Sequence, residues 1–523
     1  MTGTWVFLRA FLRRDRWMYV WWPVGIALLY VSQGWSVDGL YRTQEEFDKA
    51  AAGMEGNAAL IAMAGPARAL NTTGGQVAWQ SAAFGAILVG LMSMFLVGRH
   101  TRAEEESGRD ELLRAAPVGR YAPLTAALFD AVLANLVVGL VTAGGLAAYG
   151  LATADSFGLG LGVTFCGWFF TGVALIAAQL TTSTRAAYGL TGAVIGVAYA
   201  LRAFGDVSAA ALSWLSPIGW YQAMHAFSGL RWWPALLLVA GAAVALAVAF
   251  AVFDRRDFGS GVLPARPGAP RAARSLASGP GLAWRLQRAT VIAWTVGLLL
   301  SGLAFGSMGN DVNDLVGDSE VSRDLITQGG ADIVDGFYAM LMLMLALVAA
   351  GFAVSSALRP RGEEDAGRVE ALLATGLPRS RWLAGHVLVT VAGVVVVLGA
   401  SGLGLGVSYA LVTGDAGAVC RMTWQVLTFL PGVLALSGLA RLLHGVVPRA
   451  ASLAWLGVLL AYVVLIFGEL LKLPQWLQDL SPFEHLAAVP VDDFRWTPFL
   501  LVATLALALS VAGQIAFSRR DVH

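Results

Sequence analysis

Two charged segments of this chain match each other in residue type and in spacing. The first reads Arg102-Ala-Glu-Glu-Glu-Ser-Gly-Arg-Asp-Glu and the second reads Arg361-Gly-Glu-Glu-Asp-Ala-Gly-Arg-Val-Glu, so they align without a gap. A charged loop is free to vary unless something docks on it, so two matching copies indicate two equivalent docking points for a partner. The shared residues are Glu104, Glu105, Gly108, Arg109 and Glu111 in the first copy and Glu363, Glu364, Gly367, Arg368 and Glu370 in the second.

Both copies have the spacing of short helices interrupted by a glycine. On a helix, Glu105 and Arg109 would form an i,i+4 ion pair, as would Glu364 and Arg368, and each pair would contribute about 0.2–0.5 kcal/mol. A glycine inside a helix costs about 1 kcal/mol relative to alanine. Because that cost recurs at the same position, we expect either a close backbone approach or a bend between two short helices there.

The elements that flank these segments are apolar. A mean hydropathy of +0.67 excludes an ordinary soluble protein, as does a composition of 57% hydrophobic and 13% charged residues. A membrane-spanning helix needs about 20 apolar residues, whereas barrel strands are half as long and alternate in polarity. We therefore predict an all-α polytopic membrane protein. About twelve apolar runs begin near Met18, Gln80, Leu124, Gly158, Ala187, Pro234, Val291, Val334, Trp382, Thr423, Ala451 and Pro498.

The duplication extends along the whole chain. Leu215-Ser-Pro217 recurs as Leu480-Ser-Pro482, and Phe253-Asp-Arg-Arg-Asp257 recurs as Phe517-Ser-Arg-Arg-Asp521. With an even number of spans in each half, the repeats would be parallel, each with six helices. We predict a first half at 1–257 with an amphipathic interfacial helix at its start and a charged loop at 99–121. A Pro-, Gly- and Arg-rich linker at 258–281 and a second half at 282–523, with a charged loop at 358–381, would follow.

The charges of the loops alternate in sign along the chain. Arginines dominate the N-terminus, both charged segments, the linker and the C-terminus, while the loops in between carry mainly aspartate and glutamate. Since cytoplasmic loops of membrane proteins are enriched in Lys and Arg, this pattern predicts a multi-pass protein of the bacterial cytoplasmic (inner) membrane. Both termini and both charged segments would be cytoplasmic.

The charged segments resemble a known transporter element. The pattern Glu-Glu-x-x-Gly-Arg-x-Glu-x-Leu-x-Ala after the second span of a six-span unit is similar to the first intracellular loop of ABC-2 type exporter permeases. The fused twelve-span arrangement resembles the actinobacterial polyketide-antibiotic (tetronasin-type) exporters. The resemblance implies that each segment is a coupling helix docking on an ATPase subunit, and that hydrophobic compounds (antibiotics, drugs or lipid-like molecules) are moved out of the cell.

The chain carries no motif for hydrolysing ATP itself. A phosphate-binding loop needs Gly-x-x-x-x-Gly-Lys-Ser/Thr, and neither lysine of this chain, Lys49 or Lys472, has such a context. We therefore expect a transport subunit and not an enzyme, with no cofactor or metal of its own. ATP and magnesium would bind to a separately encoded P-loop ATPase, in two copies per chain. Membrane lipid is a further expected partner, and nucleic acid is not.

The main alternative is a proton-coupled secondary multidrug transporter. Such a transporter needs ionisable groups inside the membrane, each of which costs about 2.5–3.5 kcal/mol at a helix centre. Asp130 is the best candidate, but Val389 stands at the matching position of the second half. A third interpretation is a membrane scaffold for cell-envelope enzymes that transports nothing itself.

The resemblance places the substrate cavity between the second and fifth spans of each half. Methionine and aromatic side chains in these spans suit varied hydrophobic ligands, because they repack easily. The candidate lining residues are Phe84, Met92, Phe95, Tyr199, Phe337, Tyr338 and Met342.

Overall fold

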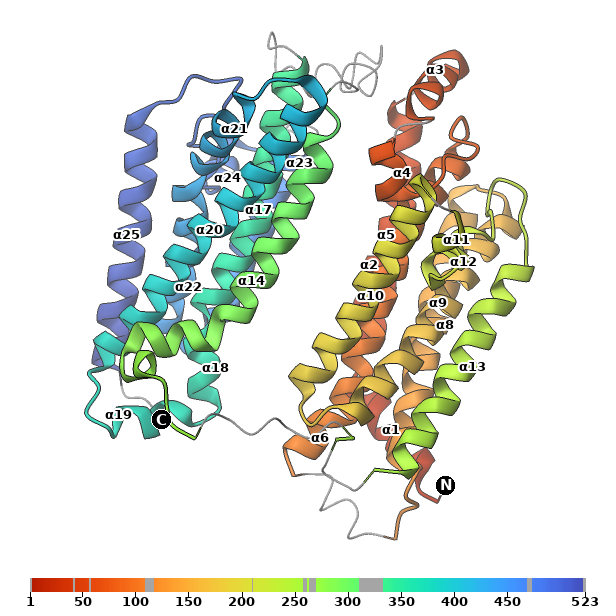
Figure 1. Ribbon diagram of the computed structural model, residues 1–523, viewed down its shortest axis with the longest axis horizontal. Coiled ribbons are helices and arrows are strands. Elements are labelled where there is room, and N and C mark those ends of the chain that lie inside the picture. The colour runs from red at the N-terminus through yellow and green to blue at the C-terminus, as the bar shows by residue number, and fades with distance from the viewer. Residues whose placement is uncertain are drawn as a thin grey trace. The chain divides into compact units, whose positions relative to one another are not determined.

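The computed structural model consists of two compact units, residues 1–268 and 269–523. Figure 1 shows the helices of both units. The structure describes residues 2–40, 43–55, 58–108, 117–208, 210–256, 261–262, 270–309, 333–467 and 473–520.

The prediction of an all-α polytopic membrane protein is confirmed. Within the described ranges, eleven helices are long and apolar enough to cross a membrane. Their positions match the predicted runs, apart from the first. That run forms α2 (Met18–Leu40), whose 23 residues suffice to span a membrane, but Trp, Tyr, Ser and Gln side chains lower its hydropathy.

The first unit is a bundle centred on one helix. The central helix α9 packs against α5, α8 and α13, while α2 packs against α5 and α8. Its core includes the fully buried rings of Tyr30, Phe170 and Tyr221. The helices are α1 (Thr4–Arg14), α2, α3 (Gln44–Met54), α4 (Ala58–Ala64), α5 (Thr73–His100), α6 (Arg102–Glu106), α8 (Ala122–Tyr149), α9 (Thr153–Leu180), α10 (Thr184–Val207), α11 (Ala210–Ser213), α12 (Pro217–Gln222) and α13 (Trp233–Asp254).

The second unit repeats this packing. Helix α14 packs on α20 as α2 does on α8, and α22 packs on α25 as α9 does on α13. Phe352 and Phe429 lie in its core. The helices are η1 (Arg274–Ala277), α14 (Gly279–Gly306), α17 (Ile333–Ala357), α18 (Arg359–Asp365), α19 (Arg368–Leu373), α20 (Arg379–Thr413), α21 (Ala418–Leu427), α22 (Leu430–Val446), η2 (Pro448–Leu453), α23 (Ala454–Phe467), α24 (Gln475–Gln478) and α25 (Trp496–Arg519).

Glycines allow the central helices to approach closely in both units. A Cβ at Gly160 of α9 would lie 2.4 Å from the Gly139 carbonyl oxygen of α8, and one at Gly445 of α22 would lie 2.3 Å from the Gly513 carbonyl oxygen of α25. Small residues at such contacts are typical of helix packing inside membranes. Substituting either glycine would push a helix pair apart.

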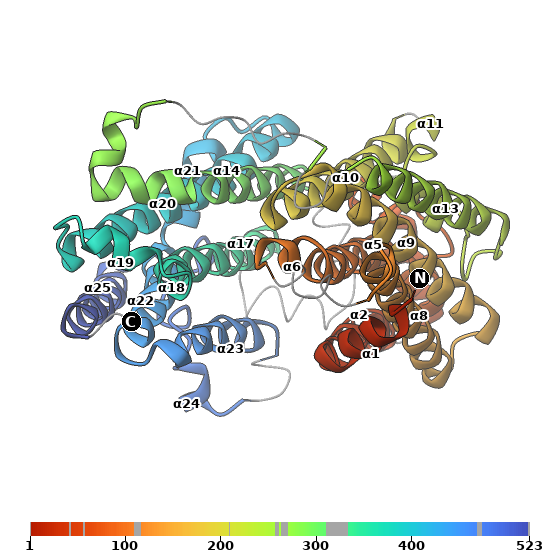
Figure 2. The ribbon, with the colours of Figure 1, turned by 90° about the horizontal axis from the view of Figure 1, so that it is seen from below.

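Helix α1 is amphipathic, as predicted, and lies against the bundle. Its residues Phe7, Leu8 and Phe11 are buried against Ala122 and Ala126 of α8. In Figure 2 the N-terminal helix α1 lies beside α8. The end of each unit at which its charged segment lies is called the charged end below, and α1 lies at the charged end of the first unit.

Candidate functional site

Each charged segment begins as a short helix and then bends at its glycine. In the second unit, α18 ends at Asp365 and Gly367, with φ +66°, precedes α19. In the first unit, α6 ends at Glu106 and Gly108 has φ +70°. No atom outside the adjoining residues lies within 4 Å of a Cβ built on either glycine. The glycines therefore serve the bend and not a close backbone approach, because the left-handed conformation disfavours every other residue type.

In the first unit an arginine from beyond the last helix holds the charged segment. Arg256, two residues past the end of α13 and only 6% exposed, donates to the Glu105 carboxylate over 2.5 and 3.2 Å. Arg102 donates to the same carboxylate over 2.7 Å and also to the Ala178 carbonyl of α9. We call the Glu105–Arg256 contact the first loop clamp.

The second unit builds the same contact from the matching residues. Arg520, which follows α25, donates to the Glu364 carboxylate over 2.5 Å, and His444 Nε2 of α22 lies 2.9 Å from its other oxygen. Arg520 also donates to the His444 carbonyl over 3.2 Å. This Glu364–Arg520 contact is the second loop clamp.

The far end of each charged segment is also tied to the last helix. Arg120 donates to the Phe253 carbonyl of α13 over 3.3 Å, and the equivalent Arg379 donates to the Arg520 carbonyl over 2.6 Å. The guanidinium groups of the two clamps lie over the rings of Phe253 and Phe517, at 5.8 and 5.4 Å from their centroids. Each repeated Phe-x-Arg-Arg-Asp motif thus fixes both ends of one charged segment.

The expected i,i+4 pair between Glu364 and Arg368 does not form. Arg368 Nε instead lies 2.6 Å from Glu363 Oε2, because Gly367 ends α18 and turns the Arg368 side chain back. This hydrogen bond raises the pKa of Arg368 above its ordinary value, so the group stays charged. Glu363 also pairs with Arg359 over 2.6 Å. The matching Glu104 pairs with Arg14 of α1.

Several acidic side chains of the charged segments face outward from the clamps. Glu106 of α6, Asp365 of α18 and Glu370 of α19 are exposed. Of the predicted site residues, Arg109 and Glu111 lie outside the described residues. The buried glutamates thus hold the segments, while the exposed ones are accessible to a partner.

An apolar groove of about 420 Å³ lies between α14, α17 and α23 of the second unit. Trp294, Met344, Trp455 and Tyr462 line it, and Trp455 and Tyr462 are 42% and 46% exposed. Helices α17 and α23 are the second and fifth long helices of this half, the pair at which the sequence predicts a cavity. A groove lined by methionine and aromatic rings suits a hydrophobic ligand.

Most of the predicted cavity residues do not line this groove. Tyr338 and Met342 are buried in the core of the second unit, against which Phe337 packs, and Met92 is buried in the core of the first. Tyr338 and Met342 thus point from α17 toward the interior of the second bundle, and Met92 points from α5 toward that of the first. In the first unit, Phe84 and Phe95 are 39% and 38% exposed, while Tyr199 belongs to the network described next.

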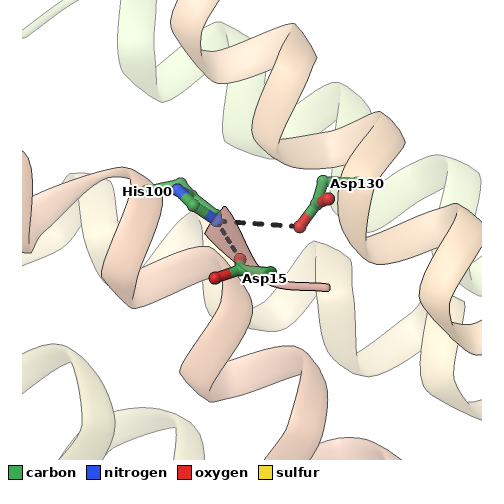
Figure 3. Close-up of side chains that lie close together, drawn as sticks. All are labelled: Asp15, His100 and Asp130. Atoms are coloured by element: carbon green, nitrogen blue, oxygen red, sulfur yellow. Dashed lines mark hydrogen bonds and ion pairs between the residues drawn. The ribbon is translucent and has the colours of Figure 1, made fainter. Parts of the chain in front are cut away.

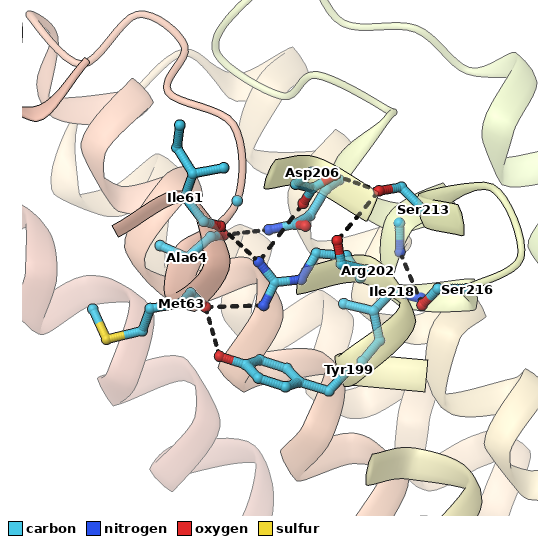
Figure 4. A network of polar contacts seen from close by, with 12 residues as sticks. Ile61, Met63, Ala64, Tyr199, Arg202, Asp206, Ser213, Ser216 and Ile218 are labelled. Carbon is cyan, nitrogen blue, oxygen red and sulfur yellow. Dashed lines mark hydrogen bonds and ion pairs between the residues drawn. The ribbon is translucent and has the colours of Figure 1, made fainter. Parts of the chain in front are cut away.

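A polar network holds α4 at the end of the first unit opposite the charged end (Figure 4). Arg202 of α10, fully buried, donates to the carbonyls of Ile61 and Met63 over 3.2 and 2.9 Å, and the Tyr199 hydroxyl donates to Met63 over 2.8 Å. Trp79 of α5 donates to the Gly65 carbonyl over 2.7 Å. A single arginine within an apolar run was the only sequence sign of this network.

The fold and the two loop clamps define a polytopic membrane protein built from two copies of one helical unit. The chain belongs to the family described as multidrug efflux system permease Rv1217c, C-terminal domain, whose model matches it twice, at residues 8–254 and 276–518. The multidrug efflux system permease protein Rv1217c of Mycobacterium tuberculosis (strain ATCC 25618 / H37Rv) is 39% identical to it over 530 residues, covering 100% of this chain and 96% of that protein.

Proposed function

We propose that this chain is the membrane subunit of an ATP-binding-cassette exporter that moves hydrophobic compounds, drugs among them, out of the cell. The observation that carries this proposal is the pair of loop clamps, in which equivalent glutamates of two charged segments bind equivalent arginines beyond the last helix of each half. Two identically supported docking segments fit a partner that acts as two copies. The multidrug efflux relative supports the proposed kind of substrate.

The clamps offer a route by which movement of a partner reaches the membrane helices. A partner docking on the exposed residues of α6 or α18 would push on a segment that is held to α13 or α25 by charge-assisted hydrogen bonds. Such bonds are short and about twice as strong as neutral ones, and they weaken little when buried from water. A displacement of the segment is therefore passed to the last helix of its half.

ATP and magnesium belong to the partner in this proposal. Lys49 lies on α3, with a side chain 67% exposed, and it pairs with Glu45 over 3.0 Å, so it is not placed to bind phosphate beside a helix N-terminus. Lys472 lies outside the described residues. A separately encoded P-loop ATPase, in two copies per chain, would supply the hydrolysis, with one copy at each charged segment.

The proposed location is the bacterial cytoplasmic membrane, with both termini and both charged ends in the cytoplasm. At the charged end of the first unit lie Arg14, Arg99, Arg102, Arg120 and Arg256, all in the contacts described here. Of the charged residues at 44–55, at the opposite end, four are acidic and one is basic. The positive-inside rule supports this orientation.

The substrate would be a lipophilic molecule entering from the membrane. The groove between α14, α17 and α23 is almost wholly apolar and open, and aromatic rings line it. Burying apolar ligand surface there contributes about 25 cal/mol per Å².

A proton-coupled transporter is the second candidate, and one observation favours it. Asp130 is fully buried, with His100 Nε2 at 3.7 Å and Tyr19 donating to it over 3.1 Å. A buried carboxyl beside an imidazole is a possible proton carrier. The second half offers no equivalent, since Val389 stands there.

The deciding experiment combines Glu111→Ala with Glu370→Ala in the chain co-expressed with its ATPase. Export should be lost while the complex still assembles and hydrolyses ATP. The matched control is Glu45→Ala with Glu55→Ala, which removes two exposed glutamates at the opposite end and should leave export intact. Unchanged export in the first variant would contradict the role of the charged segments.

A further inference from the structure

Three titratable side chains from separate segments meet inside the charged end of the first unit (Figure 3). Asp15 lies between α1 and α2, His100 is the last residue of α5, and Asp130 belongs to α8. All three side chains are fully buried. One ligand atom from each lies within 4.8 Å of the others.

We propose that Asp15, His100 and Asp130 bind one divalent transition-metal cation of the zinc class. The ligand atoms would be Asp15 Oδ2, His100 Nε2 and Asp130 Oδ2. Imidazole and carboxylate groups together suit zinc and its neighbours better than magnesium or calcium, which prefer oxygen alone. The proposal goes beyond the exporter function and does not depend on what powers it.

The distances are near those of a metal site. His100 Nε2 lies 3.7 Å from Asp130 Oδ2 and in contact with Asp15 Oδ2. Around a tetrahedral zinc ion with bonds of about 2.0–2.1 Å, ligand atoms lie about 3.3 Å apart. Side-chain shifts of under about 1 Å would therefore bring all three atoms to one ion.

Each carboxylate is held by a second group at its other oxygen. Arg99 Nη1 lies 2.8 Å from Asp15 Oδ1, and the Tyr19 hydroxyl donates to Asp130 Oδ1 over 3.1 Å. Phe11 stacks on the His100 ring at 3.8 Å and fixes its plane. Outer partners that orient the ligands in this way are typical of metal sites.

The oxygen that Asp130 turns toward the centre has no hydrogen-bond partner. Asp130 Oδ2 is buried without a hydrogen-bond partner, and His100 Nε2 lies 3.7 Å away, beyond hydrogen-bond distance. Arg99 forms an ion pair with Asp15. A buried carboxylate without a partner is strongly unfavourable, and a cation at the centre would remove that penalty.

The second unit shows that the fold does not need these charges. Gln287 stands in place of Asp15, Val389 in place of Asp130, and Arg359, which pairs with Glu363 over 2.6 Å, in place of His100. There, Ser356 donates to Gln287 over 2.5 Å, Gln287 lies 3.2 Å from His386, and neutral groups complete the network. Because the second half closes the same junction without either aspartate, the two buried carboxylates of the first half point to a ligand.

The sequence predicts no metal, because the three residues lie far apart and have no ligand spacing. In the folded chain they meet at the end of α5. Helix α6, which carries the first loop clamp, begins two residues after His100. A bound ion would join the α1–α2 junction, the end of α5 and α8. It would thereby stabilise the end of α5, from which the first charged segment continues.

The test uses the full chain, purified with a tag that contains no histidine, stripped with a chelator and titrated with Zn²⁺. Calorimetry and elemental mass spectrometry should give one zinc per chain. The variant Asp15→Gln with Asp130→Val copies the second half at both carboxylate positions, so it should fold, and its zinc affinity should fall more than about 10-fold. The control Glu45→Gln with Glu55→Gln removes two acidic charges elsewhere and should keep the zinc.

A second measurement keeps the test decisive if that variant misfolds. Zinc should raise the melting temperature of the unsubstituted chain and of the control, and should not raise that of Asp130→Asn. Zinc content in the unsubstituted chain no higher than in the copied variant would overturn the proposal. The protonated imidazole of His100 would then be the cation between the two carboxylates.

Discussion

Replacing Glu364 by glutamine is expected to loosen α18 from the end of α25. The Glu364 carboxylate is 8% exposed and accepts from Arg520 over 2.5 Å, with His444 at 2.9 Å. Glutamine has nearly the same shape, so the change removes the charge and leaves the packing. It also offers a donor where the carboxylate had only acceptors.

The size of the effect follows from the burial of the two partners. Breaking a fully buried ion pair costs about 3–5 kcal/mol, because the remaining charge is stranded. The Arg520 side chain is 20% exposed and can turn toward water, whereas His444 is 1% exposed and cannot. We therefore expect a loss of about 2 kcal/mol in local stability, which corresponds to roughly 30-fold.

Hydrogen exchange in lipid nanodiscs measures this loss directly. Amide exchange in α18 and in the last turn of α25 should quicken about 30-fold, while the central turns of α20 should keep their protection. The control is Glu370→Gln, an exposed glutamate on α19, for which the change should stay within about 0.5 kcal/mol. Equal exchange rates in the two variants would refute the structural role given to the second loop clamp.

Three further changes test other parts of the structure. Gly367→Ala should lower the free energy of local opening of α18 and α19 by about 1–2 kcal/mol, because Gly367 has φ +66°. Gly362→Ala inside α18 should be neutral or stabilising, since nothing lies near a Cβ at that position. A larger loss from Gly362→Ala than from Gly367→Ala would contradict the bend. Arg202→Met should destabilise the segment around α4 by about 3 kcal/mol, because it leaves buried carbonyl groups without a donor. Proteolysis around α4 should become faster, and unchanged cleavage would argue against the network. Trp294→Ala should weaken binding of a lipophilic dye about tenfold, while Trp476→Ala, 67% exposed and outside the groove, should not.

The helical architecture was predictable because membrane spans leave a strong signal. Runs of about 20 apolar residues gave the positions of eleven helices, and the repeated charged segments revealed the duplication. The bend at each charged segment was also one of two expected outcomes, since glycine at matching positions has a conformational meaning. Only α2 was less apolar than its length suggested.

The partners of the site residues were not predictable. Glu364 was expected to bind Arg368, four residues away, but the left-handed Gly367 separates them and Arg520, far along the chain, takes its place. Met342 was expected in a cavity and lies in the core instead. A helix that is apolar on every side carries no polarity difference to show which face meets lipid, ligand or core.

The most direct test of the central claim is the energy source of export. The purified chain and its ATPase partner would be reconstituted in liposomes and supplied with a lipophilic substrate. We predict transport that requires ATP and magnesium, persists with a protonophore and stops when the P-loop lysine of the partner is replaced. Transport that needs no ATP and collapses with the protonophore would contradict the proposed function and make Asp130 the coupling residue.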